Sequence, residues 1–179
     1  DLDSALNFAR QIGRKSLANL SFTERGALLV EMSKTIHAHR EELIELGQQN
    51  AGNTRGDAKF DIDGASHTLM HYGKLAESLG DGNILFDGEP EPVARGGRLV
   101  GQHILVPRGG VAIHINAFNF PAWGLAEKAA CALLAGMPVL SKPATSTALM
   151  THALVEALAP IMPEGTLSLL CGSVGSLLD

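Results

Sequence analysis

The sequence predicts an α/β fold in which N-terminal helices pack on a doubly wound parallel sheet. Two observations carry this prediction. In the first 80 residues, apolar positions recur at spacings of three and four, which is typical of amphipathic helices. From residue 111 onward, short apolar runs alternate with longer helical patterns and are joined by short turns. That alternation is the pattern of parallel strands linked by crossover helices.

Residues 1–80 are expected to form a helical lead. Ser21 and Glu24 have the spacing of a capping box, in which the Ser hydroxyl accepts from the Glu amide and the Glu side chain reaches back. Leu28, Met32 and Ile36 then recur every four residues and give one apolar stripe. A turn at 52–56 separates this helix from a second one. The second helix follows 57–61 and has apolar positions Ile62, Ala65, Leu69, Tyr72, Ala76 and Leu79.

Residues 81–110 are expected to be a strand and turn segment, with a strand at Leu99–Val106 and a turn at Pro107–Gly110. Residues 111–179 are expected to form a βαβαβ unit of a parallel, doubly wound sheet. Parallel sheets of this kind bind ligands beyond the carboxyl ends of their strands. The expected strands are Val111–Ile115, Pro138–Ser141 and Leu167–Cys171, and the expected helices are Ala122–Leu134 and Ala148–Leu158.

Composition narrows the classes of function. The chain has 179 residues, enough for one domain with a hydrophobic core, and 45% of them are hydrophobic. The net charge of −5 is scattered, so no nucleic-acid partner is expected. With no apolar run near 18 residues and no signal peptide, no membrane partner and a cytoplasmic location are expected. The start at Asp1 and the stop at Asp179 suggest a fragment.

Asn119 is the strongest candidate for chemistry. It lies just past the first expected strand of the βαβαβ unit, where its amide could donate a hydrogen bond to a developing oxyanion. The structural alternative is an Asx turn that leads into the helix, with Pro121 in the first turn. Spacing alone does not decide between them.

Lys142 follows the second expected strand. It could bind ribose hydroxyls or neutralise a phosphate, and Thr145 could share that work. A solvated Lys and a helix-capping Thr145 are the alternative. After the third strand, the turn that contains Gly172 and Ser173 would let the backbone approach a pyrophosphate, although it lacks the full G-x-G-x-x-G fingerprint.

Other polar residues favour structural roles. Cys131 lies in a run of Ala and Leu and is expected to be a buried small hydrophobe. His67 and His71 share a helix face without a third ligand, so no metal site is expected, and His37 and His39 have no better claim. The adjacent pair Glu127 and Lys128 could handle protons near a cofactor or be an ordinary polar edge.

Three segments together resemble the aldehyde dehydrogenase superfamily in order and spacing. They are Ile115-Asn-Ala-Phe-Asn-Phe-Pro121, Gly136-Met-Pro-Val-Leu-Ser-Lys-Pro-Ala-Thr145 and Pro163-Glu-Gly-Thr-Leu-Ser-Leu-Leu-Cys-Gly172. Arg25 also stands where the family often has an Arg within a helix. The resemblance covers essentially the whole chain and implies the N-terminal part of an aldehyde dehydrogenase cofactor-binding domain. The full-length protein would then be an NAD(P)-dependent enzyme and a homo-oligomer.

By this resemblance, Asn119 would be the oxyanion donor. The family's nucleophilic Cys and general-base Glu would lie downstream of residue 179, since neither Cys131 nor Cys171 matches the nucleophile's motif. Where many members have Glu after Lys-Pro-Ala, this chain has Thr145, which implies NADP, with NAD possible. The implied cofactor contacts are Ile115, Asn116, Ala117, Phe118, Lys142, Ala144, Thr145, Gly172 and Ser173.

The motifs look most like the phenylacetate and benzoate degradation branch of the family. Members of that branch oxidise coenzyme A-linked semialdehydes from aromatic ring cleavage, and some carry a hydratase domain. Two alternatives remain open from the sequence. The chain could be a non-catalytic cofactor-binding or scaffolding fragment, or part of a general aliphatic aldehyde dehydrogenase.

Overall fold

A computed structural model describes residues 1–172 of the chain. Six helical segments form the N-terminal lead: α1 (Leu2–Phe8), which continues through η1 (Ala9–Gly13) into α2 (Arg14–Ala18), and then α3 (Phe22–Ala38), α4 (Arg40–Ala51) and α5 (Arg55–Leu79). A hairpin of β1 (Leu85–Pro92) and β2 (Val100–Leu105) follows. The βαβαβ unit comprises β3 (Ala112–Ile115), α6 (Pro121–Leu134), β4 (Val139–Lys142), η2 (Thr145–Thr147), α7 (Ala148–Leu158), η3 (Ala159–Ile161) and β5 (Leu167–Leu169).

The helical lead contains both of the long helices that the sequence predicts. The capping box of α3 is present: the Ser21 Oγ accepts from the Glu24 amide at 3.2 Å, and the Glu24 carboxylate accepts from the Ser21 amide at 2.8 Å. Thr54 caps α5 through the amide of Asp57. The expected long helix therefore starts slightly earlier, at Arg55, and α4 is a separate helix that the sequence pattern left unresolved.

The buried face of α3 differs at one residue from the apolar stripe read from the sequence. Leu28 is only partly buried, and Leu29 is fully buried in its place together with Met32 and Ile36. A strict spacing of four drifts around a helix of 3.6 residues per turn, so the buried stripe needs spacings of three as well. Phe22 and Leu29 satisfy that requirement.

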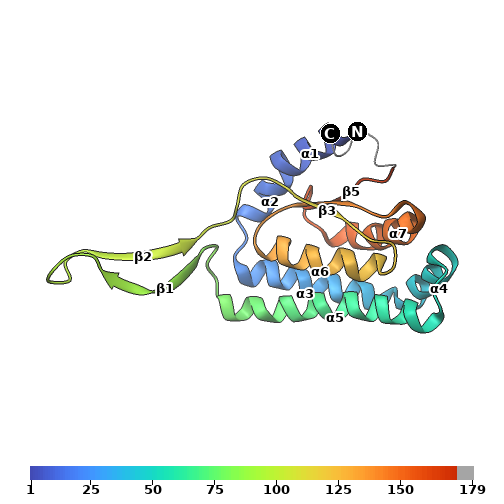
Figure 1. Cartoon of the computed structure of the whole chain (residues 1–179), viewed down its shortest axis with the longest axis horizontal. Helices are drawn as coiled ribbons and strands as arrows, with labels where there is room; N and C mark the ends of the chain where they lie inside the picture. The colour runs from blue at the N-terminus through green and yellow to red at the C-terminus, as the bar shows by residue number, and fades with distance from the viewer. Residues whose placement is uncertain (173–179) are drawn as a thin grey trace.

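The core lies between helices α3, α5 and α6, which run side by side in Figure 1. Close approach of α3 and α5 depends on two glycines: a Cβ on Gly26 would fall 2.3 Å from the Ala76 Cβ, and one on Gly73 would fall 2.6 Å from a Val30 methyl. Ser33 and Ser66 hydrogen-bond across the same interface and satisfy their buried hydroxyls. The core is built mainly from aliphatic residues and Ala, with Phe22 as a buried aromatic residue.

The three strands of the βαβαβ unit form a parallel sheet, as the sequence predicts, and their order in the sheet is β3-β4-β5. Each strand matches its predicted range to within two residues at either end. Gly13 packs on Gly165 and Pro138, in the turns that lead into β5 and β4, so the N-terminal segment meets the amino edge of the sheet. The opposite, carboxyl edge carries the predicted site.

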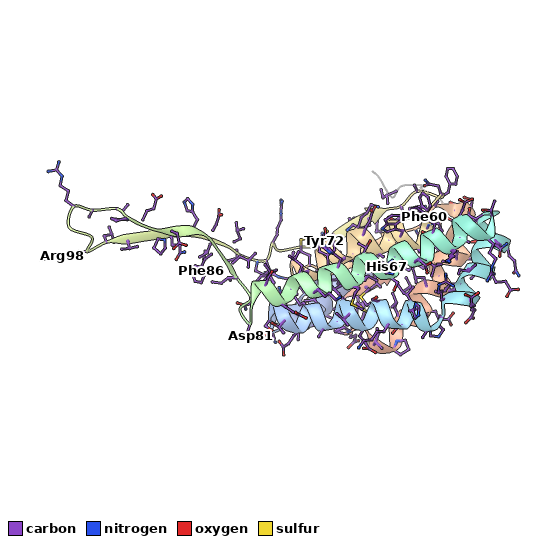
Figure 2. All side chains as sticks on the ribbon, turned by 90° about the horizontal axis from the view of Figure 1, so that it is seen from below. Phe60, His67, Tyr72, Asp81, Phe86 and Arg98 are labelled. Atoms are coloured by element: carbon purple, nitrogen blue, oxygen red, sulfur yellow. The ribbon has the colours of Figure 1, made fainter. Side chains whose placement is uncertain are left out.

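The hairpin extends away from the helices and the sheet (Figure 1), and Figure 2 shows Phe86 along it and Arg98 at its far end. Val100–Leu105 lies within the predicted strand, whereas β1 was not predicted. Gly88, Pro90 and Pro92 disfavour a regular strand, and the pairing is indeed interrupted between Asp87 and Glu91. Large apolar side chains remain exposed on this hairpin: Phe86, Val93, Leu99, Val100, Ile104 and Leu105.

Within residues 1–172, no helix combines the length and the apolar character that crossing a bilayer requires.

Candidate cofactor and oxyanion site

The carboxyl ends of β3 and β4 bring two predicted segments together. Ile115 lies opposite Lys142 in the parallel register, and the Asn116 amide donates to the Lys142 carbonyl at 3.0 Å. The segment with Asn119 and the segment with Thr145 therefore leave the sheet at the same edge. In open α/β sheets this edge is where ligands bind.

Asn119 is exposed and lies between β3 and α6. Its side chain takes part in none of the hydrogen bonds among residues 1–172, so the Asx turn considered above is not formed. Pro121 occupies the first position of α6, as expected for a residue without an amide hydrogen. The side-chain amide of Asn119 is therefore free to donate a hydrogen bond, and its direction depends on the backbone conformation on either side of the residue.

Asn116 is buried, with 6% of its surface exposed. Its Nδ2 donates to the Ser141 Oγ at 2.9 Å, while its Oδ1 is buried without a partner in the described part of the chain. A buried acceptor without a donor is costly, so this atom suits a ligand group that donates a hydrogen bond. The neighbouring Ile115 and Phe118 are 51% and 64% exposed and offer apolar surface at the same edge. Ala117, between Asn116 and Phe118, is exposed as well.

Lys142 is also buried, with 6% exposed, and its ammonium donates to the Pro143 carbonyl at 2.8 Å. An ammonium has three donors, so two remain for a ligand. Ala144 is partly buried and Thr145 is exposed at the start of η2. The capping alternative for Thr145 is wrong, because Thr147 takes the N-cap position of α7 and Asn50 accepts from the Met150 amide.

Glu127 and Lys128 form a pair on α6. The Lys128 ammonium donates to the Glu127 carboxylate at 3.1 Å and to the Gly124 carbonyl at 2.8 Å. Burial, helped by the Lys128 charge, lowers the pKa of His114, whose Nδ1 is buried without a partner among the described residues.

The expectation of a buried Cys131 was wrong, since the structure exposes it on α6. Its run of Ala and Leu covers all sides of the helix, so composition could not tell which side faces the core. The Cys131 thiol raises the pKa of Tyr72 on α5. His67 and His71 join no group of three metal-ligating side chains within the described ranges.

Gly172 is exposed at a φ of +152°, which favours glycine. Ser173, the other residue predicted in that turn, lies outside the described residues. The exposed Cys171 precedes Gly172.

The sequence interpretation missed Asp61, which is buried in the first half of α5 with 2% exposed. Its carboxylate accepts from the Ala122 amide at 3.1 Å and from the Trp123 amide at 2.7 Å, and both belong to the first turn of α6. Asp61 lies three residues after Ala58 and four before Ala65, on the buried stripe of α5. A carboxylate at a position of the apolar stripe of α5 is the sequence signal that could have revealed this role.

Comparison with known proteins identifies the family. The model of the aldehyde dehydrogenase family matches residues 1–178. The chain belongs to the aldehyde dehydrogenase family. Its α/β fold and the superfamily resemblance of its three motif segments are thereby confirmed.

Among family members, the 3,4-dehydroadipyl-CoA semialdehyde dehydrogenase of Aromatoleum evansii is 45% identical over 181 residues, covering 100% of this chain and 35% of that protein. The 2,5-dioxopentanoate dehydrogenase of Saccharolobus solfataricus is 32% identical over 83% of this chain and 30% of its own length. The chain thus spans about a third of the length of these relatives.

Solved structures of other proteins superpose well on this chain. HpcC from Thermus thermophilus gives a TM-score of 0.82 at 24% identity, covering 97% of this chain and 32% of that one. Proline utilization A from Bradyrhizobium japonicum gives 0.81 at 25% identity, over 98% of this chain and 18% of that one. These likenesses concern the fold.

Proposed function

We propose that this chain supplies the oxyanion donor and part of the dinucleotide site of an enzyme that oxidises an aldehyde to a carboxylic acid. The observation that carries the proposal is the free amide of exposed Asn119, next to a helix whose first turn is fixed and at the edge shared with Lys142. Fixed donors that meet developing negative charge are among the largest catalytic contributions.

In the proposed reaction, a Cys thiolate from outside this chain adds to the aldehyde carbon and the carbonyl oxygen becomes an oxyanion. Asn119 donates its amide hydrogen bond to that oxygen. A dinucleotide held at this edge would supply the hydride acceptor, and water would then hydrolyse the resulting thioester to the acid and release the Cys thiolate. Cys131 and Cys171 have no part in this, and Glu127 with Lys128 is proposed to handle protons beside the site.

The residues at the carboxyl edge fit a dinucleotide. Asn116 presents an unpartnered buried acceptor, Lys142 retains two ammonium donors, and Ile115 and Phe118 expose apolar surface. In the proposal, residues 115–118 line the nicotinamide side, while Lys142, Ala144 and Thr145 hold the adenosine ribose. Gly172 and Ser173 belong near the phosphates, and the whole chain, residues 1–179, is the N-terminal part of the cofactor-binding domain.

NADP is the proposed cofactor. A carboxylate at position 145 would repel a 2′-phosphate, whereas Thr145 is neutral and exposed, and Lys142 attracts the phosphate. NAD remains the alternative that the experiment below compares.

A coenzyme A-linked semialdehyde is the proposed substrate. The support is the name of the 45% identical relative, a 3,4-dehydroadipyl-CoA semialdehyde dehydrogenase. A pathway of aromatic degradation in the cytoplasm suits such a substrate. A general aliphatic aldehyde is the second candidate, and a non-catalytic cofactor-binding module is the third.

A homo-oligomer is proposed as well. The hairpin exposes apolar side chains on an extended ribbon, and Val100 and Ile104 of β2 are 53% and 50% exposed. A two-stranded ribbon of this kind gains stability when another element covers it. Acidic Asp87, Glu89 and Glu91 and basic Arg95 and Arg98 occupy different parts of the hairpin, which favours pairing between copies.

The test is steady-state oxidation by the full-length protein, with coenzyme A-linked and free semialdehydes and with NADP and NAD. We expect the highest kcat/KM with the linked substrate and NADP. Thr145→Glu should raise the KM for NADP roughly tenfold, about 1.4 kcal/mol, and favour NAD. Ser146→Glu places the same charge one residue away and should have a smaller effect. A higher efficiency of the wild type with NAD would contradict the NADP proposal.

A further inference from the structure

The first turn of α6 has no cap of its own. Phe120 stands at the N-cap position and carries no side-chain oxygen, and Pro121 at the first helical position has no amide hydrogen. The amides of Ala122 and Trp123 are the next two, and both donate to Asp61 of α5 at 3.1 and 2.7 Å. A residue 61 positions away along the chain therefore does the work of an N-cap side chain.

A carboxylate is a costly choice for this task. Burial raises the pKa of Asp61 to about 6, against the lowering effect of the two amide donors. The same chain caps α3 with the hydroxyl of Ser21 and α5 with that of Thr54, so neutral caps serve its other long helices. A carboxylate accepts from two amides at once, which holds the turn in one orientation. The helix dipole also favours negative charge at this end.

Further contacts between α5 and α6 fix the same turn. The Trp123 indole donates to the Thr68 hydroxyl at 2.9 Å, and its ring lies over Gly64, where a Cβ would fall 2.5 Å from it. Phe60 packs edge-on against both Phe120 and Trp123 at 6.0 and 5.3 Å between ring centroids. Figure 2 shows Phe60 toward the end of α5 that lies away from the hairpin, and His67 about midway along the helix. A cavity of about 420 Å³ opens between these side chains.

The geometry points to Asp61 as a positioning residue for Asn119. Asn119 precedes Phe120 directly, and its own side chain is bound to nothing among residues 1–172. Its placement therefore depends on the backbone that leads into the turn Asp61 holds. This inference rests on the proposed oxyanion role of Asn119, and the experiment below separates failure of one from failure of the other.

Several ionisable groups on the elements packed around Asp61 pair with other side chains, while the charges of Lys59 and His67 help to lower the pKa of Asp63. Asp63 pairs with Arg40 of α4 at 2.7 Å, and Asp57 accepts from Thr54 at 2.7 Å. Glu127 pairs with Lys128 on α6, and Glu31 with Lys34 on α3. Within the described ranges, the pKa of Asp61 is set by burial and the two amides, and not by any of these charges.

The experiment is a double-mutant cycle in the full-length protein. It combines Asp61→Asn, which keeps the shape but turns one acceptor into a donor, with Asn119→Ala. Ser21→Ala is the matched control, because it removes a helix cap outside the site. The readouts are kcat, KM for aldehyde and NADP, and hydrogen exchange of the Ala122 and Trp123 amides.

We expect Asp61→Asn to lower kcat about tenfold, to leave KM for NADP within about twofold, and to speed exchange at both amides. In the Asn119→Ala background it should lower kcat less than about twofold, because its effect passes through Asn119. Ser21→Ala should leave kcat unchanged.

A tenfold loss from Asp61→Asn in both backgrounds would overturn the positioning role and leave the oxyanion role standing. An unchanged kcat in Asp61→Asn, despite faster exchange of the Ala122 and Trp123 amides, would also overturn the positioning role. A different result would show that the proposed function itself fails: the single variant Asn119→Ala would keep the kcat of the wild type. That result would overturn both the oxyanion role of Asn119 and the positioning role of Asp61.

Discussion

Each end of α6 is held by a buried charged side chain from another helix, and these two side chains have opposite charges. At the N-terminal end, the buried Asp61 carboxylate accepts from two amides. At the C-terminal end, the buried Arg25 guanidinium of α3 donates to the Leu134 carbonyl at 3.3 Å and to the Leu17 carbonyl at 3.1 and 3.3 Å. Neither charge has an ion-pair partner among residues 1–172, and each matches the helix dipole at its end.

What differs is the neighbourhood. Arg25 joins the C-terminal ends of α2 and α6 and packs against Gly136. Gly136 has a left-handed φ of +80°, and a Cβ at this position would lie about 3.0 Å from the guanidinium of Arg25. Nothing predicted to bind or react lies there. Asp61 holds the end that follows Asn119. We therefore expect the Arg25 end to determine stability and the Asp61 end to determine chemistry.

Replacing Arg25 should give the largest effect. Arg25→Ala removes three hydrogen bonds and leaves a cavity, so we expect a loss of about 3–5 kcal/mol in the free energy of unfolding. Urea unfolding measures it. Arg25→Met fills the same space without the donors and should lose less. A large drop in kcat per folded molecule, with little loss of stability, would break the assignment of this end.

Asn119→Ala should act in the opposite way. The exposed side chain makes no hydrogen bond within residues 1–172, so stability should change by less than about 0.5 kcal/mol. The loss of an oxyanion donor should lower kcat about 10²–10³-fold, or about 2.7–4 kcal/mol in the barrier. Initial rates at saturating substrates measure this. A kcat within about threefold of the wild type would rule out the donor.

The smallest effect concerns pH. The pKa of Asp61 is about 6 in the folded chain, above the ordinary 3.8, so folding favours the protonated form. The stability from this preference is fully present below about pH 4 and is lost as the pH rises through 6, at most about 3 kcal/mol. Unfolding of Asp61→Asn should lack this dependence, so its stability should gain on the wild type between pH 5 and 7.5. A constant difference over that range would contradict the raised pKa.

The sequence predicted the elements whose signals are local. The capping box at Ser21 and Glu24, the three parallel strands and the start of α6 near Pro121 all depend on short spacings. It failed where tertiary contact decides. The exposure of Cys131 depends on which side of α6 meets the core, and β1 forms although Gly and Pro interrupt it.

The same distinction applies to the site. Asn116, Asn119 and Lys142 follow strands and could be placed at one edge from strand order alone. The role of Asp61 depends on the packing of α5 against α6, which brings together residues 61 positions apart in the sequence. The cap of α7 by Asn50 likewise joins residues 100 positions apart. Neither contact has a local pattern, although a carboxylate on a buried stripe marks where to look.

The most direct test of the central claim is a crystal structure of the full-length protein with NADP. The account predicts the nicotinamide beside residues 115–119, with the side-chain amide of Asn119 facing the place of the aldehyde oxygen, and the 2′-phosphate close to Lys142 and Thr145. A dinucleotide bound away from the carboxyl ends of β3 and β4, or an Asn119 amide turned from the reacting centre, would contradict it.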